Sequence, residues 1–256
     1  MFVGVHSSSV LPFVARAVVL VAIVLAIPVQ SLARTQVGVS LLLLAGTHYE
    51  TQSSANEHVG APLFDFLTGG KRLEFAAEGI PTFGITSSGS SATFRTGTTS
   101  LGFGDAVFQY ALDAKSRCWL GAGSIVIDQQ TNFAHATYPS DYLTESSRVS
   151  GVRYEARLNL PVAQNAVIVS VAGSPSLWGT YFASNCRYCH LAQFSTPEHG
   201  AMTDTSAMFE IPRGRSIWDF GVRFINYSAT FTHYNVLADR NVGGGIEIEY
   251  RYLIAR

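Results

Sequence analysis

Charged residues are scarce in this 256-residue chain, at 14% of the sequence, and Lys plus Arg (17) nearly balance Asp plus Glu (18). A soluble domain ordinarily carries about 25% charged residues. The chain also has no basic cluster or stripe of the kind that neutralises nucleic-acid phosphates. The composition therefore argues against an ordinary soluble domain and against nucleic acid as a partner.

Long apolar runs are missing as well, apart from the N-terminus. No other stretch approaches the ~20 consecutive apolar residues that a membrane-spanning helix needs, and no segment has a sustained 3.6-residue period with helix caps. Walker loops, dinucleotide fingerprints, H-E-x-x-H and nucleophile elbows are absent too. The sequence thus excludes a helical membrane protein and favours a protein without enzymatic activity.

The first 33 residues resemble a segment that is removed on export. Arg16 is their only Lys, Arg, Asp or Glu, Ala17–Ile27 is an 11-residue apolar core, and Ser31–Ala33 supplies the small residues that signal peptidase requires. An uncleaved membrane anchor is the alternative, but the apolar core is too short to span a bilayer. We predict a signal peptide over 1–33 and a mature part over 34–256.

Strict alternation of apolar and polar residues is the main pattern of the mature part. In Val149–Leu160 the residues Val152, Tyr154 and Ala156 alternate with charged ones, and Leu73–Gly79, Ile217–Phe224 and Ile246–Tyr252 repeat the pattern. A two-residue period indicates strands with one apolar and one polar face. The charged members of the polar faces are Glu74, Glu78, Arg153, Glu155, Arg157, Asp219, Arg223, Glu247, Glu249 and Arg251.

The links between these segments alternate in length. Short links rich in turn residues are expected near 68–71, 112–116, 160–165 and 212–215, and long polar links at 47–57, 86–97, 131–146, 181–203 and 232–240. The expected strands between them are 36–46, 58–67, 71–85, 97–112, 117–130, 147–160, 165–180, 204–211, 216–231 and 241–253. Omitting 58–67 and 204–211 leaves eight strands as the alternative. Either number is even, which puts both ends of the mature chain on one side.

This organisation indicates an all-β, antiparallel, up-and-down transmembrane barrel of about ten strands, with short periplasmic turns and long outer loops. A soluble β-sandwich also alternates faces. Its strands are shorter, however, because globular strands are most often about 5–6 residues long. We therefore expect a barrel whose charged residues converge on its lumen.

The mature region 34–256 resembles the class of small bacterial outer-membrane β-barrels. The resemblance implies location in the cell outer membrane, contact with outer-membrane lipid and lipopolysaccharide, and insertion by the barrel-assembly machinery. Members usually end in an aromatic residue after alternating hydrophobic ones. Here Tyr250 and Tyr252 supply the alternation, but Arg256 is the last residue.

A narrower resemblance concerns Gly221–Ala229 (GVRFINYSA), which is similar to the seventh-strand region of the lipid A deacylase barrels. It implies Ser228 as a weak candidate nucleophile and a lipid A-modifying envelope enzyme as one alternative function. Asn226 occupies the place of that family's catalytic His, and an amide cannot take the proton of the hydroxyl. His233 lies five residues after Ser228. An odd spacing of this kind points the two side chains to opposite faces of a strand.

Cys186, Cys189 and His190 form a C-x-x-C-H sequence within the long link 181–203. Export permits disulfides, so we expect a Cys186–Cys189 disulfide, with Cys118 left unpaired. A metal site that adds His199 to these three residues is a weak alternative. Covalent c-type haem, which the same signature allows, is disfavoured because the segment lacks a helical pattern. No cofactor is expected.

The charged lumen has two interpretations. Side chains of both signs can pair and make the interior rigid, or they can line a narrow path for a small solute. A wide diffusion pore is disfavoured because wide aqueous channels need about 16 strands. Many members of an aromatic set are expected in girdles at the bilayer interfaces, and a ligand-binding aromatic cluster is the alternative. This set comprises Trp119, Tyr154, Trp178, Tyr181, Phe182, Trp218, Phe220, Tyr250 and Tyr252.

The sequence therefore predicts a non-enzymatic barrel of structural, surface-interaction or narrow-transport type. A small-solute channel with a charged lumen and a lipid A-modifying enzyme remain as alternatives. A surface ligand of unknown identity would bind the links 131–146 and 181–203.

Overall fold

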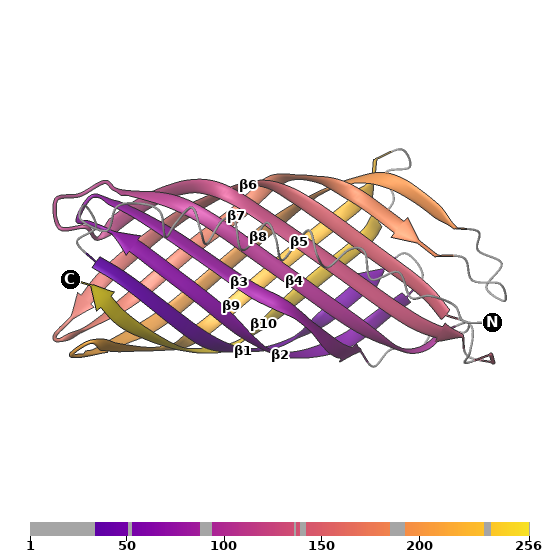
Figure 1. The fold of residues 1–256 in the computed structure, drawn as a ribbon, viewed down its shortest axis with the longest axis horizontal. Helices are drawn as coiled ribbons and strands as arrows, with labels where there is room; N and C mark the ends of the chain where they lie inside the picture. Colours follow the sequence, from indigo (N-terminus) through magenta and orange to yellow (C-terminus); the bar gives the residue numbers. More distant parts are fainter. Residues whose placement is uncertain are drawn as a thin grey trace.

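The computed structural model describes residues 34–50, 53–87, 94–135, 137–138, 142–184, 193–232 and 237–255, and they form one closed antiparallel barrel of ten strands (Figure 1). The strands are β1 (Arg34–Glu50), β2 (Ser53–Gly69), β3 (Leu73–Ser87), β4 (Phe94–Ala111), β5 (Cys118–His135), β6 (Tyr142–Val162), β7 (Asn165–Ala183), β8 (Phe194–Arg213), β9 (Ser216–Phe231) and β10 (Leu237–Ala255). Each strand pairs with its neighbours in sequence, and β10 closes on β1. The predicted up-and-down barrel is confirmed, with ten strands rather than eight.

The two ends of the barrel differ in how the strands are connected. Short connections at 70–72, 112–117, 163–164 and 214–215 share one end with the start of β1 and the finish of β10 (Figure 1). We call it the turn end, and the opposite end the loop end. The predicted signal peptide, 1–33, lies outside the described residues, and β1 begins directly after it.

The strands extend well beyond the predicted ranges at the loop end. The expected link 47–57 is mostly strand, because β1 and β2 pair as far as Glu50 opposite Ser53. The expected link 131–146 is strand as far as His135 and again from Tyr142. A polar composition does not by itself end a strand, because the ladder is held by backbone hydrogen bonds, so the expectation of links over these residues is wrong.

The two faces of each strand follow the alternation in the sequence. On β1, Val37 and Leu41 are exposed on the outside of the barrel, whereas Gln36, Ser40 and Leu42 are buried inside it. Glycines provide room where neighbouring backbones approach closely. A Cβ at Gly123 would lie 1.8 Å from the carbonyl oxygen of Ala106.

Tight turns close the hairpins at the turn end. In the β4–β5 connection, the Asp113 carboxylate accepts hydrogen bonds from the backbone N–H groups of Arg117 and Cys118, at 2.6 and 2.9 Å. Ser116 and, in the β6–β7 turn, Ala163 have positive φ angles of 55°.

No helix in the described part of the chain is long and apolar enough to cross a membrane.

Candidate functional site: the charged lumen

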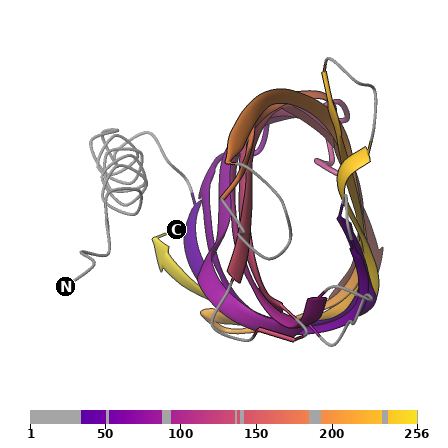
Figure 2. The ribbon, with the colours of Figure 1, turned by 90° about the vertical axis from the view of Figure 1, so that its right-hand side faces the viewer.

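The half of the lumen near the turn end is filled with charged side chains. Viewed from the loop end, the strands surround the interior of the barrel (Figure 2). A cavity of about 160 Å³ lies within it, lined by eight carboxylate residues and four arginines among others. The carboxylates are Asp65, Glu78, Asp105, Glu155, Asp204, Asp219, Glu247 and Glu249, and the arginines are Arg153, Arg157, Arg223 and Arg251.

Alternation on β6 and β10 brings the largest charged side chains into the lumen. Arg153, Glu155 and Arg157 project from β6, and two of them lie opposite glycines of β5, with Gly123 facing Arg153 in the register. Long side chains thus face positions that have none, which leaves room for their charged groups. On β9, Gly221 has the same relation to Glu247 of β10.

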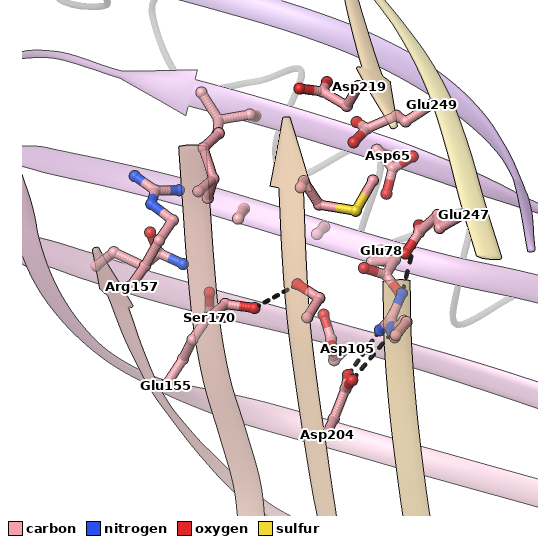
Figure 3. Close-up of a pocket in the computed structure, with 18 of the residues that line it drawn as sticks. Asp65, Glu78, Asp105, Glu155, Arg157, Ser170, Asp204, Asp219, Glu247 and Glu249 are labelled. Carbon is pink, nitrogen blue, oxygen red and sulfur yellow. Dashed lines mark hydrogen bonds and ion pairs between the residues drawn. The ribbon is translucent and has the colours of Figure 1, made fainter. Parts of the chain in front are cut away.

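Asp204 is the centre of the first group of ion pairs. Its Oδ2 accepts from Arg223 Nη2 at 2.6 Å and from Arg153 Nη2 at 3.0 Å. Arg153 also reaches Asp105, with Nε 2.9 Å from Oδ2. Arg223 further contacts Glu78 at 2.7 Å. Figure 3 shows these carboxylates converging from different strands. Five charges that are costly to bury alone therefore compensate one another.

Two smaller groups lie closer to the turn end. Arg251 donates to Asp219 from Nε at 2.9 Å and to Glu210 from Nη2 at 2.8 Å, and its Nε lies 3.1 Å from Glu249 Oε1. Arg157 donates to Glu74 Oε2 at 2.5 Å. The Arg157 guanidinium also lies over the ring of Trp119, 5.0 Å from its centroid, in a cation–π contact.

All ten charged residues selected from the sequence lie in this lumen, and most take part in its ion pairs. Sequence reasoning missed Asp65, Asp105, Asp204 and Glu210, which lie on β2, β4 and β8. Those strands lack a strict alternation of charged and apolar residues. For Asp105 the sequence did contain a signal. It lies two residues from both Phe103 and Val107, which are buried, so all three side chains point to the same face of β4.

An apolar layer closes the lumen on the loop-end side of the charges. Along almost every strand, the inward residues that follow the charged ones toward the loop end are apolar. The buried members are Leu42, Ala61, Leu63, Ile80, Phe103, Ile125, Ile127, Val149, Leu177, Met202, Tyr227 and Ala229. Leu42, Leu63 and Leu177 are 0% exposed. The apolar side chains that the structure describes thus form one buried cluster across this level of the lumen.

A buried polar layer lies beyond the apolar one, toward the loop end. Ser147 Oγ donates to Glu198 Oε1 at 2.7 Å and lies 3.2 Å from the Tyr227 hydroxyl. Gln129 and Thr131 of β5 are buried in the same region. The lumen is thus stratified into charged, apolar and polar layers.

The other predicted site residues lie elsewhere. Ser228 is on the outer face of β9, since the adjacent Tyr227 faces the lumen. His199 is on the outer face of β8, where its Nε2 lies 3.0 Å from the Thr230 hydroxyl. The described residues include no group of three or more His, Cys, Asp or Glu side chains that could hold a metal ion. His233, Cys186, Cys189 and His190 are outside the described residues, and so is the disulfide expected there; Cys118 is a free cysteine.

The aromatic set is divided between the two faces of the wall. Trp178 and Trp218 are exposed on the outside, and Trp218 contacts Phe220 and Tyr250. Trp119 and Tyr181 are 3% and 2% exposed and face the lumen, so these two are not among the girdle residues. Alternation divides the residues of a strand between two faces. Which of the two faces points into the lumen depends on how the strand pairs with its neighbours.

Large apolar side chains cover the outer surface. The exposed ones include Val37, Val39, Leu41, Leu43, Phe64, Phe108, Leu120, Val152, Tyr154, Val171, Trp178, Phe220, Val222, Phe224, Ile246 and Ile248. A surface this apolar around a closed barrel requires hydrocarbon as its solvent.

Comparison with solved structures supports the same conclusion. The outer membrane protease OmpT from Escherichia coli matches with a TM-score of 0.60 at 7% identity, over 86% of this chain and 97% of that one. The translocator domain of the autotransporter NalP from Neisseria meningitidis matches with a TM-score of 0.50 at 12% identity, over 94% and 95%. No protein-family model matches the sequence, and no curated protein does. Fold and outer surface together show that the chain is a ten-stranded outer-membrane β-barrel protein.

Proposed function

We propose that the protein is a non-enzymatic, non-conducting barrel that acts as a structural and surface-interaction element of the outer membrane. The apolar layer across the lumen is the observation that supports this proposal. A hydrated solute that passed the paired charges would have to lose its water among Leu42, Leu63 and Leu177, which are 0% exposed. The charged layer then serves to hold β3, β4, β6, β8, β9 and β10 together from inside.

Planar-bilayer recordings test the proposal. The purified protein is expected to give no single-channel current. A Leu42→Ser/Leu177→Ser variant would hydrate the apolar layer, and its current should favour cations because the cavity has eight carboxylates and four arginines. A steady current in the unmodified protein that changes in Arg153→Ala or Glu249→Ala would overturn the proposal in favour of a small-solute channel.

The proposal includes the partners that the sequence suggests. Residues 1–33 would direct export, the barrel-assembly machinery would insert the mature chain, and lipopolysaccharide would surround the outer half of the apolar surface. The loop end would supply contacts for a surface ligand. Deletion of residues 2–33 should keep the protein out of the outer-membrane fraction, and its normal appearance there would contradict the export role.

The absence of enzymatic activity is tested separately. Ser228 faces away from the lumen, and the residue that would have to act as its base, Asn226, is an amide. Incubation of the protein with lipid A is therefore expected to leave the mass of lipid A unchanged. Loss of an acyl chain that depends on Ser228, as judged by Ser228→Ala, would replace our proposal with a deacylase.

A further inference from the structure

The contact between β2 and β3, the β2–β3 seam, differs from the other contacts in the wall. Its ladder runs only from Gly69 opposite Glu74 to Phe64 opposite Gly79. Beyond Phe64, β2 continues to Ser53 paired with β1, and β3 continues to Ser87 paired with β4. Within the described part of the two strands, no pair joins residues 53–63 to residues 80–87. The wall therefore has an unpaired seam toward the loop end.

Two prolines explain where the ladder stops. Phe64 is the last residue of β2 in the ladder, and it lies opposite Gly79. If the ladder continued in the same register for two more residues, Pro62 would lie opposite Pro81. Proline has no N–H to donate and is tolerated in sheets only at edges and bulges. The pairing of β3 with β4 also shifts register between Ile80 and Phe83, around Pro81. The two prolines thus interrupt the hydrogen-bonded ladder at the level where it stops.

The unpaired seam begins within the apolar outer surface. On β1 the outward residues Val37 and Leu43 are exposed, and they lie opposite Phe66 and Gly60 of β2. The end of the ladder at Phe64 lies between these two levels. With the turn end in the periplasm, the unpaired seam starts near the middle of this apolar band and runs from there into the outer leaflet.

The inside of the seam is apolar too. Leu63, Ala61 and Ile80 are 0%, 2% and 6% exposed and belong to the apolar layer. Phe103, opposite Ile80 in the register, continues this surface. The seam is thus closed by side chains and not by the backbone, with hydrocarbon on one side and the apolar layer on the other. A charged or hydrated solute would have to lose its water to cross the wall at this seam.

Unpaired backbone groups at membrane depth also need partners. N–H and C=O groups are not left exposed to hydrocarbon, because nothing there can hydrogen-bond to them. The ester or amide groups and hydroxyls of a lipid can do so, at the boundary between its acyl chains and its headgroup. A molecule with an apolar chain and such polar groups fits both surfaces of the seam.

From these observations we propose that the β2–β3 seam is a lateral gate, through which an acyl chain of an outer-leaflet lipid reaches the apolar layer inside the barrel. The gate goes beyond the non-conducting function proposed above. It admits apolar chains sideways from the membrane and gives water and ions no path along the barrel axis. Bilayer currents and acyl-chain binding therefore test the two proposals separately.

Photolabelling of the full barrel in vesicles tests the gate. The vesicles contain phospholipid with a diazirine on one acyl chain, with or without added lipopolysaccharide, and labelled residues are mapped by mass spectrometry. The inward residues Leu63 and Ile80 should be labelled in addition to the outward Phe64. Labelling without lipopolysaccharide would show that any acyl lipid is admitted, whereas labelling only with it would restrict the gate to membranes that contain it.

A Pro62→Val/Pro81→Val variant, which restores both N–H groups, should lose the label on Leu63 and Ile80 and keep it on Phe64. Gln109, a buried inward residue of β4 in the charged half of the lumen, serves as the inward control and should stay unlabelled. Label confined to outward residues in the unmodified protein would overturn the gate, and this readout does not depend on the variant folding. Inward label that persists in a folded double variant would overturn it as well.

Discussion

Arg223 on β9 donates two parallel hydrogen bonds to Asp204 on β8, from Nε to Oδ1 at 3.0 Å and from Nη2 to Oδ2 at 2.6 Å. The two side chains are 5% and 4% exposed. A bidentate pair of this kind is among the stronger hydrogen-bonded contacts in proteins, and its removal on one side leaves a buried charge. Neighbouring strands are thereby tied together inside the barrel as well as along their backbones.

Arg223→Met is expected to lower the free energy of unfolding by about 3–5 kcal/mol, because Asp204 and the nearby Glu78 lose a buried partner. Urea titration of the barrel in lipid vesicles, followed by the gel shift between folded and unfolded forms, measures the change. The control is Arg213→Met, which removes an exposed arginine at the end of β8. Replacement of both members, Arg223→Met/Asp204→Leu, should recover part of the loss. Equal stability of Arg223→Met and the unmodified barrel would show that the pair contributes nothing.

Glycine at position 123 is expected to be essential for close packing of β5 on β4. A Cβ there would lie 1.8 Å from Ala106 O, so the backbone would have to move. Gly123→Ala should lower the free energy of unfolding by about 1–3 kcal/mol, as overpacking does elsewhere. Gly70→Ala is the matched control, because nothing lies within 4 Å of the Cβ it would add. Similar unfolding midpoints for the two variants would refute the steric argument.

The strand order, the barrel and much of the charged lumen could be predicted from the sequence, because alternation is a local signal. Arg153, Glu155 and Arg157 stand between apolar residues on β6, and their common face is evident without a structure. Asp204 stands in a polar stretch, AMTDTSA, where no apolar partner marks the opposite face. Its place at the centre of the ion pairs depends on the register of β8 against β7 and β9, which is not a local property.

The β2–β3 seam illustrates the same limit. Pro62 and Pro81 are visible in the sequence, but their effect depends on the register that would set them opposite each other. Trp119 is a similar case. It belongs to the aromatic set in which many residues were expected at the bilayer interfaces, but at the start of β5 it faces inward, where its Nε1 donates to Ser116 O at 2.8 Å. The break in the β2–β3 seam and the inward position of Trp119 both depend on how distant segments pair.

Asp113 should make the β4–β5 turn sensitive to acid. Hydrogen bonds from the backbone N–H of Cys118, and further ones from Arg117 and Lys115, lower the pKa of this carboxyl below its ordinary value. The stabilisation is therefore complete above the pKa of the unfolded chain, about 4, and is lost as the pH falls through the lower pKa of the folded barrel. Asp113→Ala should reduce stability at neutral pH, and the difference from the unmodified barrel should disappear in strong acid.

Urea titrations at several pH values measure this effect, with Asp113→Asn as the matched variant. Asparagine keeps an oxygen acceptor for the turn but carries no charge to titrate. At neutral pH, the stability of Asp113→Asn should therefore lie between that of Asp113→Ala and that of the unmodified barrel. A stability difference between Asp113→Ala and the unmodified barrel that is the same at all pH values would contradict a role for the carboxylate charge.

A Cys186–Cys189 disulfide is the last prediction, and the barrel geometry limits the other pairings. Cys118 begins β5 at the turn end, whereas Cys186 and Cys189 belong to the β7–β8 connection at the loop end. In the ladders, Cys118 lies opposite Leu158 of β6, which lies opposite Val169 of β7. Val169 is 14 residues before Ala183 at the end of β7, which at about 3.3 Å per residue is roughly 45 Å. Cys189 is six residues from that end, a reach of about 22 Å at most. Cys186 is three residues from the end of β7, a reach of about 11 Å at most. Cys118 therefore cannot pair with either cysteine of the same chain.

Alkylation of the unfolded, unreduced protein should modify one thiol per chain, and Cys118→Ala should leave none. After reduction the unmodified protein should take up three alkyl groups, because all three cysteines are then free. Three modified thiols before reduction would exclude the disulfide. A haem stain on a denaturing gel that disappears in Cys186→Ala would assign the same two cysteines to covalent haem instead, since thioether bonds would then hold both sulfur atoms.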